Sequence, residues 1–102
     1  MNTINTEIEG LKIIEPKIYQ DDRGFFLERF HQDKFKDLGL QWNFFQDNLS
    51  RSYPHVIRGL HYQKDPLQGK LVGVIHGRIW DVAIDLRKNS PSFGKHFELE
   101  LS

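Results

Sequence analysis

The sequence predicts an all-β protein, folded as a β-sandwich or barrel. Three observations lead to this prediction. Short stretches alternate apolar and polar residues, prolines and glycines separate these stretches, and the 102 residues include eight Phe, three Tyr and two Trp. Aromatic side chains favour strands, and many short strands with little helix are typical of sandwiches and barrels.

The clearest predicted strand runs from Trp80 to Arg87. Its even-numbered positions are apolar and its odd-numbered positions mostly polar, which indicates a half-buried antiparallel strand with polar groups on one face. The apolar run Lys70–Ile75 precedes it, and His76–Arg78 would join the two as a hairpin turn. The same alternation from His96 to Leu101 predicts a further strand that leads to the C-terminus.

The remaining predicted elements are two strands and a helix. The strands are Phe25–Phe30 and Trp42–Gln46, and the helix is Asp33–Leu38, with Asp33 as its first residue. Gly39 can end that helix, because glycine readily adopts the left-handed conformation of a helix C-terminus. The four prolines fall where loops are expected: Pro16, Pro54, Pro66 and Pro91.

Composition limits the class of protein. The length fits one domain over residues 1–102, and the absence of Cys excludes a disulfide scaffold. Fourteen basic residues balance fourteen acidic ones, so neither nucleic acid nor a membrane is an expected partner. No apolar run is long enough for a membrane helix and no signal peptide is evident, so we expect a cytoplasmic protein. The last strand reaches Ser102 without a cap, so the chain is a fragment or another subunit covers its edge.

Two segments near turns carry groups that bind ligands. Arg23 lies in Asp21–Glu28 and offers a planar fork to phosphate or carboxylate, although the bland interpretation is a solvated hairpin turn. Gln46, Asp47 and Asn48 carry side chains able to read a nucleobase or sugar hydroxyls, whereas the alternative is a simple Asx turn.

Two further segments carry candidate catalytic groups. His61 is a candidate general base, because imidazole is the side-chain group best suited to accept a proton near neutral pH, or it is a hydrogen-bonded histidine on a sheet face. A regular strand would point Arg58 and His61 to opposite faces, and Gly59 permits a bulge that brings them together. Lys70 opens an apolar run and could stabilise an oxyanion in a cavity, or it is a solvated strand end.

A metal or other cofactor is not expected. His61 lacks the second histidine that a His-x-His pair would supply, and the other four histidines are scattered singly.

Six motifs in order then identify a family. They are Asp22-Arg23-Gly24-Phe25-Phe26-x-Glu28, Phe45-Gln46-Asp47-Asn48-x-Ser50, Arg58-Gly59-Leu60-His61-Tyr62-Gln63, Gln68-Gly69-Lys70-Leu71-Val72, Asp81 to Arg87, and Ser90-Pro91-x-Phe93-Gly94. Over essentially its whole length the chain resembles the dTDP-4-dehydrorhamnose 3,5-epimerase family of dTDP-L-rhamnose biosynthesis.

This resemblance implies a cupin-type jelly roll, incomplete here at its C-terminus, that dimerises and needs no metal. It implies epimerisation of C3 and C5 of dTDP-4-keto-6-deoxyglucose through an enolate, with His61 as the general base and Lys70 steadying the enolate oxygen. Arg23 and Glu28 would bind the nucleotide and reach into the partner subunit's site. The remaining substrate contacts implied are Phe26, Gln46, Asp47, Asn48 and Arg58.

The resemblance also implies a protein nearly twice as long, whose proton-donating tyrosine and base-orienting carboxylate come after residue 102. Within this chain, Tyr53 and Tyr62 are available phenols, and Asp81 or Asp85 could pair with His61 or Lys70. A base without an assigned acid predicts partial chemistry by the chain alone. Two alternatives stay open: a related single epimerase or ketoisomerase of a dTDP-4-keto sugar, and a non-catalytic dTDP-sugar binding module.

Overall fold

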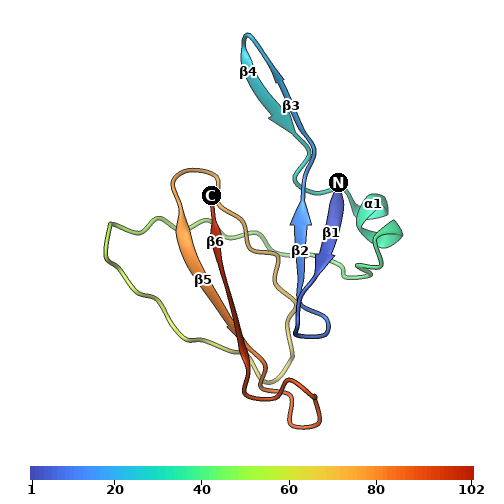
Figure 1. The fold of residues 1–102 in the computed structure, drawn as a ribbon, viewed down its shortest axis with the longest axis vertical. Helices are drawn as coiled ribbons and strands as arrows, with labels where there is room; N and C mark the ends of the chain where they lie inside the picture. Colours follow the sequence, from blue (N-terminus) through green and yellow to red (C-terminus); the bar gives the residue numbers. More distant parts are fainter.

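Three antiparallel hairpins carry most of the regular structure (Figure 1). The computed structural model describes residues 1–102. One short helix, α1, lies in the chain between the second and third hairpins. The pairs are β1 (Asn2–Asn5) with β2 (Lys12–Glu15), β3 (Ile18–Asp21) with β4 (Gly24–Leu27), and β5 (Ile79–Ile84) with β6 (His96–Leu101). The predicted all-β class is confirmed.

The β3–β4 hairpin, which we call the arm (residues 18–27), projects away from the rest of the chain (Figure 1). Its two-residue turn is closed by the pairing of Asp21 with Gly24. Gly24 has a φ of +130°, a conformation that a side chain would disfavour. The predicted strand Phe25–Phe30 is therefore correct in its first half only, because the ladder ends at Leu27.

The helix α1 (Gln32–Asp37) begins one residue before the prediction. His31 is its N-cap, and the His31 Nδ1 accepts a hydrogen bond from the Lys34 backbone N–H. The predicted stop is confirmed. Gly39 follows the helix with a φ of +77°, and its N–H donates to the Lys36 carbonyl at 2.9 Å.

The β5–β6 hairpin confirms the two clearest predicted strands, with corrected boundaries and faces. The first strand ends at Ile84 rather than Arg87. We expected the even-numbered apolar positions of β5 to be its buried side, but the opposite side is better covered. The reason is the register. Asp81 and Ala83 lie opposite Leu99 and Phe97, so the apolar side chains of β6 accompany the polar side of β5.

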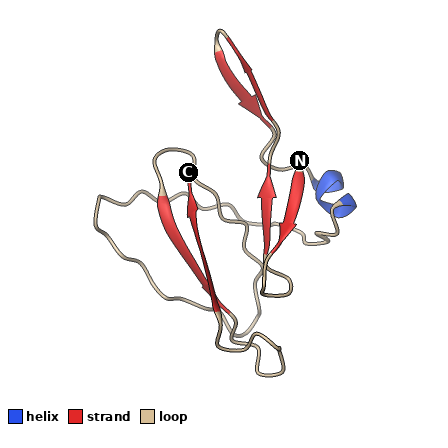
Figure 2. Ribbon diagram, viewed as in Figure 1, coloured by secondary structure: helices blue, strands red, loops and turns tan.

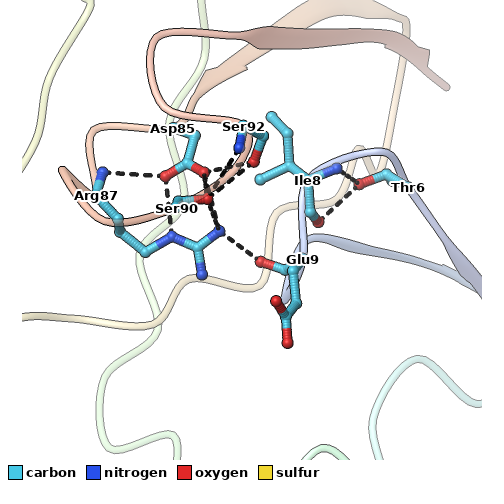
Figure 3. A network of polar contacts seen from close by, with 7 residues as sticks. All are labelled: Thr6, Ile8, Glu9, Asp85, Arg87, Ser90 and Ser92. Carbon is cyan, nitrogen blue, oxygen red and sulfur yellow. Dashed lines mark hydrogen bonds and ion pairs between the residues drawn. The ribbon is translucent and has the colours of Figure 1, made fainter.

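A network around Asp85 explains why β5 ends where it does (Figure 3). The Asp85 carboxylate accepts hydrogen bonds from the backbone and guanidinium of Arg87 and from the hydroxyls of Ser90 and Ser92. These bonds turn the chain out of the ladder. The Arg87 Nη2 also donates to the Glu9 carbonyl at 2.8 Å, which links the β5–β6 loop to the β1–β2 loop.

Residues 41–78 contain no helix or strand, as the long tan segment of Figure 2 shows. The predicted strands Trp42–Gln46 and Lys70–Ile75 are therefore wrong, as is the hairpin turn His76–Arg78. A strand needs a neighbour to receive its backbone hydrogen bonds. The one backbone–backbone bond within this segment, from the Val56 N–H to the Tyr53 carbonyl, is a local turn.

Few apolar side chains are buried. The buried ones are Ile8, Phe35 and Leu40, and of these Phe35 and Leu40 are fully covered. Phe30, Phe35 and Phe44 meet edge to face, with ring centroids 4.9 to 6.4 Å apart, and form a small aromatic cluster beside α1. The helix α1, with six residues, is far too short to span a bilayer.

Candidate active site

The arm holds Arg23 at its tip, in the two-residue turn of the hairpin. Asp21 orients the Arg23 side chain: its carboxylate accepts from the Arg23 Nη2 at 2.6 Å and from the Arg23 backbone N–H at 2.8 Å. The Arg23 hydrogen bonds lower the pKa of Asp21, and the same pair raises the pKa of Arg23. With its side chain 91% exposed, Arg23 is available to a ligand or to another subunit.

Phe26 and Glu28 lie together at the base of the arm. Both line a cavity of about 570 Å³ between the arm, the N-terminus and α1. Tyr19 lies opposite Phe26 on the neighbouring strand, and the two ring centroids are 6.4 Å apart. Two aromatic faces beside a carboxylate suit a ligand with a flat ring and hydrogen-bond donors.

Lys34 of α1 forms an ion pair with Glu28, with 2.7 Å between the Lys34 Nζ and the Glu28 Oε1. This hydrogen bond lowers the pKa of Glu28 and raises the pKa of Lys34. Lys34 was not predicted from the sequence, because a separation of six residues across a strand end and a helix start follows no periodic pattern. Asp21 was not predicted as the partner of Arg23 either, although an Asp two residues before a turn residue is a recognisable Asx signal.

The Gln46–Asn48 segment is exposed and irregular. The Gln46 Nε2 donates to the Asn48 Oδ1 at 3.2 Å, so these two amides lie side by side. Asp47 between them is exposed. Amide and carboxylate groups displayed in this way can pair with the donors and acceptors of a polar ligand.

Arg58 and His61 lie in the same irregular segment, so the alternation expected of a strand does not apply to them. The Arg58 guanidinium donates to the Ser52 Oγ at 2.8 Å and to the Arg51 carbonyl at 3.1 Å. Gly59 has a φ of +105°, and a Cβ there would lie 3.3 Å from both the backbone N and the Nδ1 of His61. Glycine at this position therefore leaves room for the imidazole.

His61 and Lys70 are exposed, and neither lines the arm cavity or the smaller hollow at the arm tip. The expected partnership of Asp85 with either residue is wrong, because Asp85 is occupied by Arg87, Ser90 and Ser92. Asp81 is partly buried beside Leu99, and no hydrogen bond joins it to His61 or Lys70. Tyr53 and Tyr62 are 77% and 75% exposed.

The described side chains include no group of three or more His, Asp or Glu residues that could hold a metal ion. The chemical groups present are a basic imidazole, an ammonium, two guanidinium forks and a set of amides and carboxylates. Such groups can move a proton, balance a negative oxygen and bind a phosphorylated ligand.

Comparison with known proteins places the chain in one family. The family model for dTDP-4-dehydrorhamnose 3,5-epimerase matches residues 5–102. The chain is 52% identical to the enzyme of that name from Escherichia coli K12, over all of this chain and 56% of the relative. A dTDP-4-dehydrorhamnose 3-epimerase from Streptomyces niveus is 40% identical over 85% of this chain and 43% of its own length.

The likeness extends to solved structures. One is the dTDP-6-deoxy-D-glucose-3,5-epimerase of Legionella pneumophila in complex with dTDP-4-keto-L-rhamnose. It is 54% identical, with a TM-score of 0.93, over 99% of this chain and 54% of that one. The chain thus spans a little over half the length of these 3,5-epimerases. Its strand-rich structure has the cupin jelly-roll fold of its relatives, and the chain belongs to the dTDP-4-dehydrorhamnose 3,5-epimerase family.

Proposed function

We propose that this chain supplies the base and the nucleotide-binding residues of a dTDP-4-dehydrorhamnose 3,5-epimerase. The observation that carries the proposal is the family match over residues 5–102, which includes every motif that bears the candidate groups. The ligand bound to the Legionella pneumophila relative, dTDP-4-keto-L-rhamnose, is a sugar nucleotide of the class proposed.

The chemistry follows from the carbonyl at C4 of the sugar. Carbons 3 and 5 both adjoin it, so removal of a proton from either one sends the C–H electron pair onto the carbonyl oxygen as an enolate. His61 accepts that proton, and the Lys70 ammonium balances the charge on the enolate oxygen. Inversion of the carbon then requires an acid that donates a proton to the opposite face of the enolate, and we assign no residue of this chain to that step. Return of the proton from His61 to the same face leaves the carbon unchanged and exchanges its hydrogen with solvent.

The nucleotide half of the substrate is assigned to the remaining candidate residues. Arg23 binds the diphosphate as a planar fork, and Phe26 and Glu28 bind the nucleoside. Gln46, Asp47, Asn48 and Arg58 complete the substrate contacts. We assign residues 1–102 to a single domain, the N-terminal part of a jelly-roll epimerase.

The working unit in this proposal is a homodimer with shared sites. The exposed arm, with Arg23 at its tip and Phe25 72% exposed, supports the idea that it enters the site of a second copy. Three separate hairpins whose apolar faces are largely uncovered also favour a covering partner.

Proton NMR of dTDP-4-keto-6-deoxyglucose in D2O tests the activity. We expect deuterium to enter at C3 and C5 with the wild-type chain and at neither position with His61→Asn. The alternative function is a single epimerase, and the Streptomyces niveus relative, a 3-epimerase by name, favours it. A single epimerase predicts exchange at one carbon only. If neither the wild type nor His61→Asn exchanges either hydrogen while dTDP still binds, the chain is a dTDP-sugar binding module and not an enzyme.

A further inference from the structure

We propose that Lys34 is the positioning residue for Glu28 at the nucleotide-binding cavity, an inference that rests on the function proposed above. Lys34 lies in α1 and Glu28 just beyond β4, and both line the cavity at the base of the arm. Lys34 is the one side chain that hydrogen-bonds the Glu28 carboxylate.

The geometry of the pair leaves Glu28 able to bind a ligand. The Lys34 Nζ donates a hydrogen bond to the Glu28 Oε1, and the Glu28 Oε2 has no hydrogen-bond partner in the chain. An ionised carboxylate is purely an acceptor, so its natural ligand groups are the N–H of a base or the O–H of a sugar. Lys34 therefore holds one oxygen while the other accepts from the nucleoside.

The surroundings of the pair support a role in binding rather than in folding. The Glu28 and Lys34 side chains are 36% and 55% exposed, and exposed ion pairs add little to folding stability. The aromatic rings of Tyr19 and Phe26 line the same cavity. A nucleoside ring that stacks there brings its donors to the Glu28 carboxylate, provided that the carboxylate is held in one orientation.

The experiment measures dissociation constants for dTDP and for thymidine by NMR titration of the 102-residue chain. In Lys34→Met, Glu28 loses its partner and must be ordered by the ligand itself. We expect both ligands to bind about fivefold more weakly, the cost of immobilising one side chain. Lys34→Arg keeps the ion pair and should restore binding.

Lys36→Met is the matched control. It removes the same charge from the same helix, but Lys36 approaches only Asp33, at 4.0 Å, and does not line the cavity. It should bind both ligands as the wild type does. In a Glu28→Gln background, Lys34→Met should cause no further loss of thymidine binding, because Lys34 then has no carboxylate to position.

Three outcomes would overturn the inference. Equal binding by Lys34→Met and Lys36→Met would show that Lys34 has no role in the cavity. A loss confined to dTDP would make Lys34 a direct diphosphate contact, not a positioning residue. Failure of the wild-type chain to bind either ligand would reject the nucleotide site, and with it the proposed function, a result distinct from the other two.

Discussion

At the scale of single residues, the chain uses one local device twice in different surroundings. In both Asp21-Asp22-Arg23 and Asp85-Leu86-Arg87, the aspartate accepts from the backbone N–H and the guanidinium of the arginine two positions later. Asp21 is 53% exposed at the arm tip, whereas the Asp85 side chain is 1% exposed. Only the second pair also joins two loops, through Arg87 and the Glu9 carbonyl.

This difference predicts unequal effects of the same substitution. In Asp85→Asn, an amide N–H₂ would face serine hydroxyls and a guanidinium that all donate hydrogen bonds. We expect a fall in Tm of roughly 5 °C or more, because a buried network is broken. Asp21→Asn is the control and should leave Tm nearly unchanged. Equal shifts in thermal unfolding followed by circular dichroism would contradict the assignment.

The same carboxylate predicts how stability depends on pH. Hydrogen bonds from Arg87, Ser90 and Ser92 hold the pKa of Asp85 far below its usual range. In the unfolded chain the Asp85 carboxylate takes up a proton at pH ~3.9, whereas in the folded chain it does so only at a much lower pH. The stabilisation that the ionised Asp85 gives to the fold is therefore complete above pH ~3.9. It is lost as the pH falls further. Urea unfolding should show an acid decline below about pH 4 that is weaker in Asp85→Asn.

At the scale of elements, the short helix α1 depends on aromatic packing for its stability. Six residues are too few for an isolated helix. Phe35 is 1% exposed and lies edge to face against Phe30 and Phe44. Since α1 carries Lys34, this small cluster also places one side of the candidate nucleotide cavity.

Truncation of this anchor should therefore destabilise the region. We expect Phe35→Ala to lower the free energy of unfolding by about 3 kcal/mol, as for other buried phenylalanines. Phe45→Ala, at a position 92% exposed, is the matched control and should change it by less than about 0.5 kcal/mol. Urea titrations of both variants give the comparison, and similar values for the two would refute the anchoring role.

The β5–β6 hairpin has apolar side chains on both of its faces. Trp80, Val82 and Ile84 lie on the face shared with Glu98 and Glu100, and they are 36 to 62% exposed. Phe97, Leu99 and Leu101 lie on the other face. A two-stranded ribbon with two apolar faces requires a layer against each of them.

At the scale of the whole molecule, the chain is more open than a closed domain of its size. Its accessible surface is 9587 Å², whereas a compact protein of 12.1 kDa has roughly 6,000 Å². The radius of gyration is 15.2 Å, against about 13 Å for a compact domain of this length. The three hairpins do not pack on one another. The chain exposes roughly 3,600 Å² more than a compact monomer, well above the ~800 Å² that each partner buries in a standard interface.

The proposed homodimer can be tested by measuring the mass of the protein in solution. Analytical ultracentrifugation should find a species of twice 12.1 kDa, with monomer appearing on dilution. Phe25→Ser, on the exposed arm, should weaken association at least about tenfold, because exposed aromatic residues are frequent anchors of interfaces. A wild-type chain that stays monomeric over the whole concentration range would exclude the dimer.

The sequence by itself determined the features that are written in local patterns. Alternation predicted β5 and β6, Gly39 predicted the end of α1, and Asp-Arg-Gly predicted the turn of the arm. The ordered motifs around Arg23, His61 and Lys70 identified the family. Each of these signals depends on neighbouring residues and on backbone geometry, so no knowledge of distant contacts was needed.

Only the tertiary structure decided what depends on residues far apart in the chain. The runs Trp42–Gln46 and Lys70–Ile75 have strand-like composition, but no neighbouring strand accepts their hydrogen bonds. The buried side of β5 followed from its register with β6 and not from its own pattern. Arg87, which is paired with Asp85, also donates a hydrogen bond to the Glu9 carbonyl, and Glu28 forms an ion pair with Lys34 of α1. Pairing and burial are properties of two segments at once, and one segment's sequence does not specify its partner.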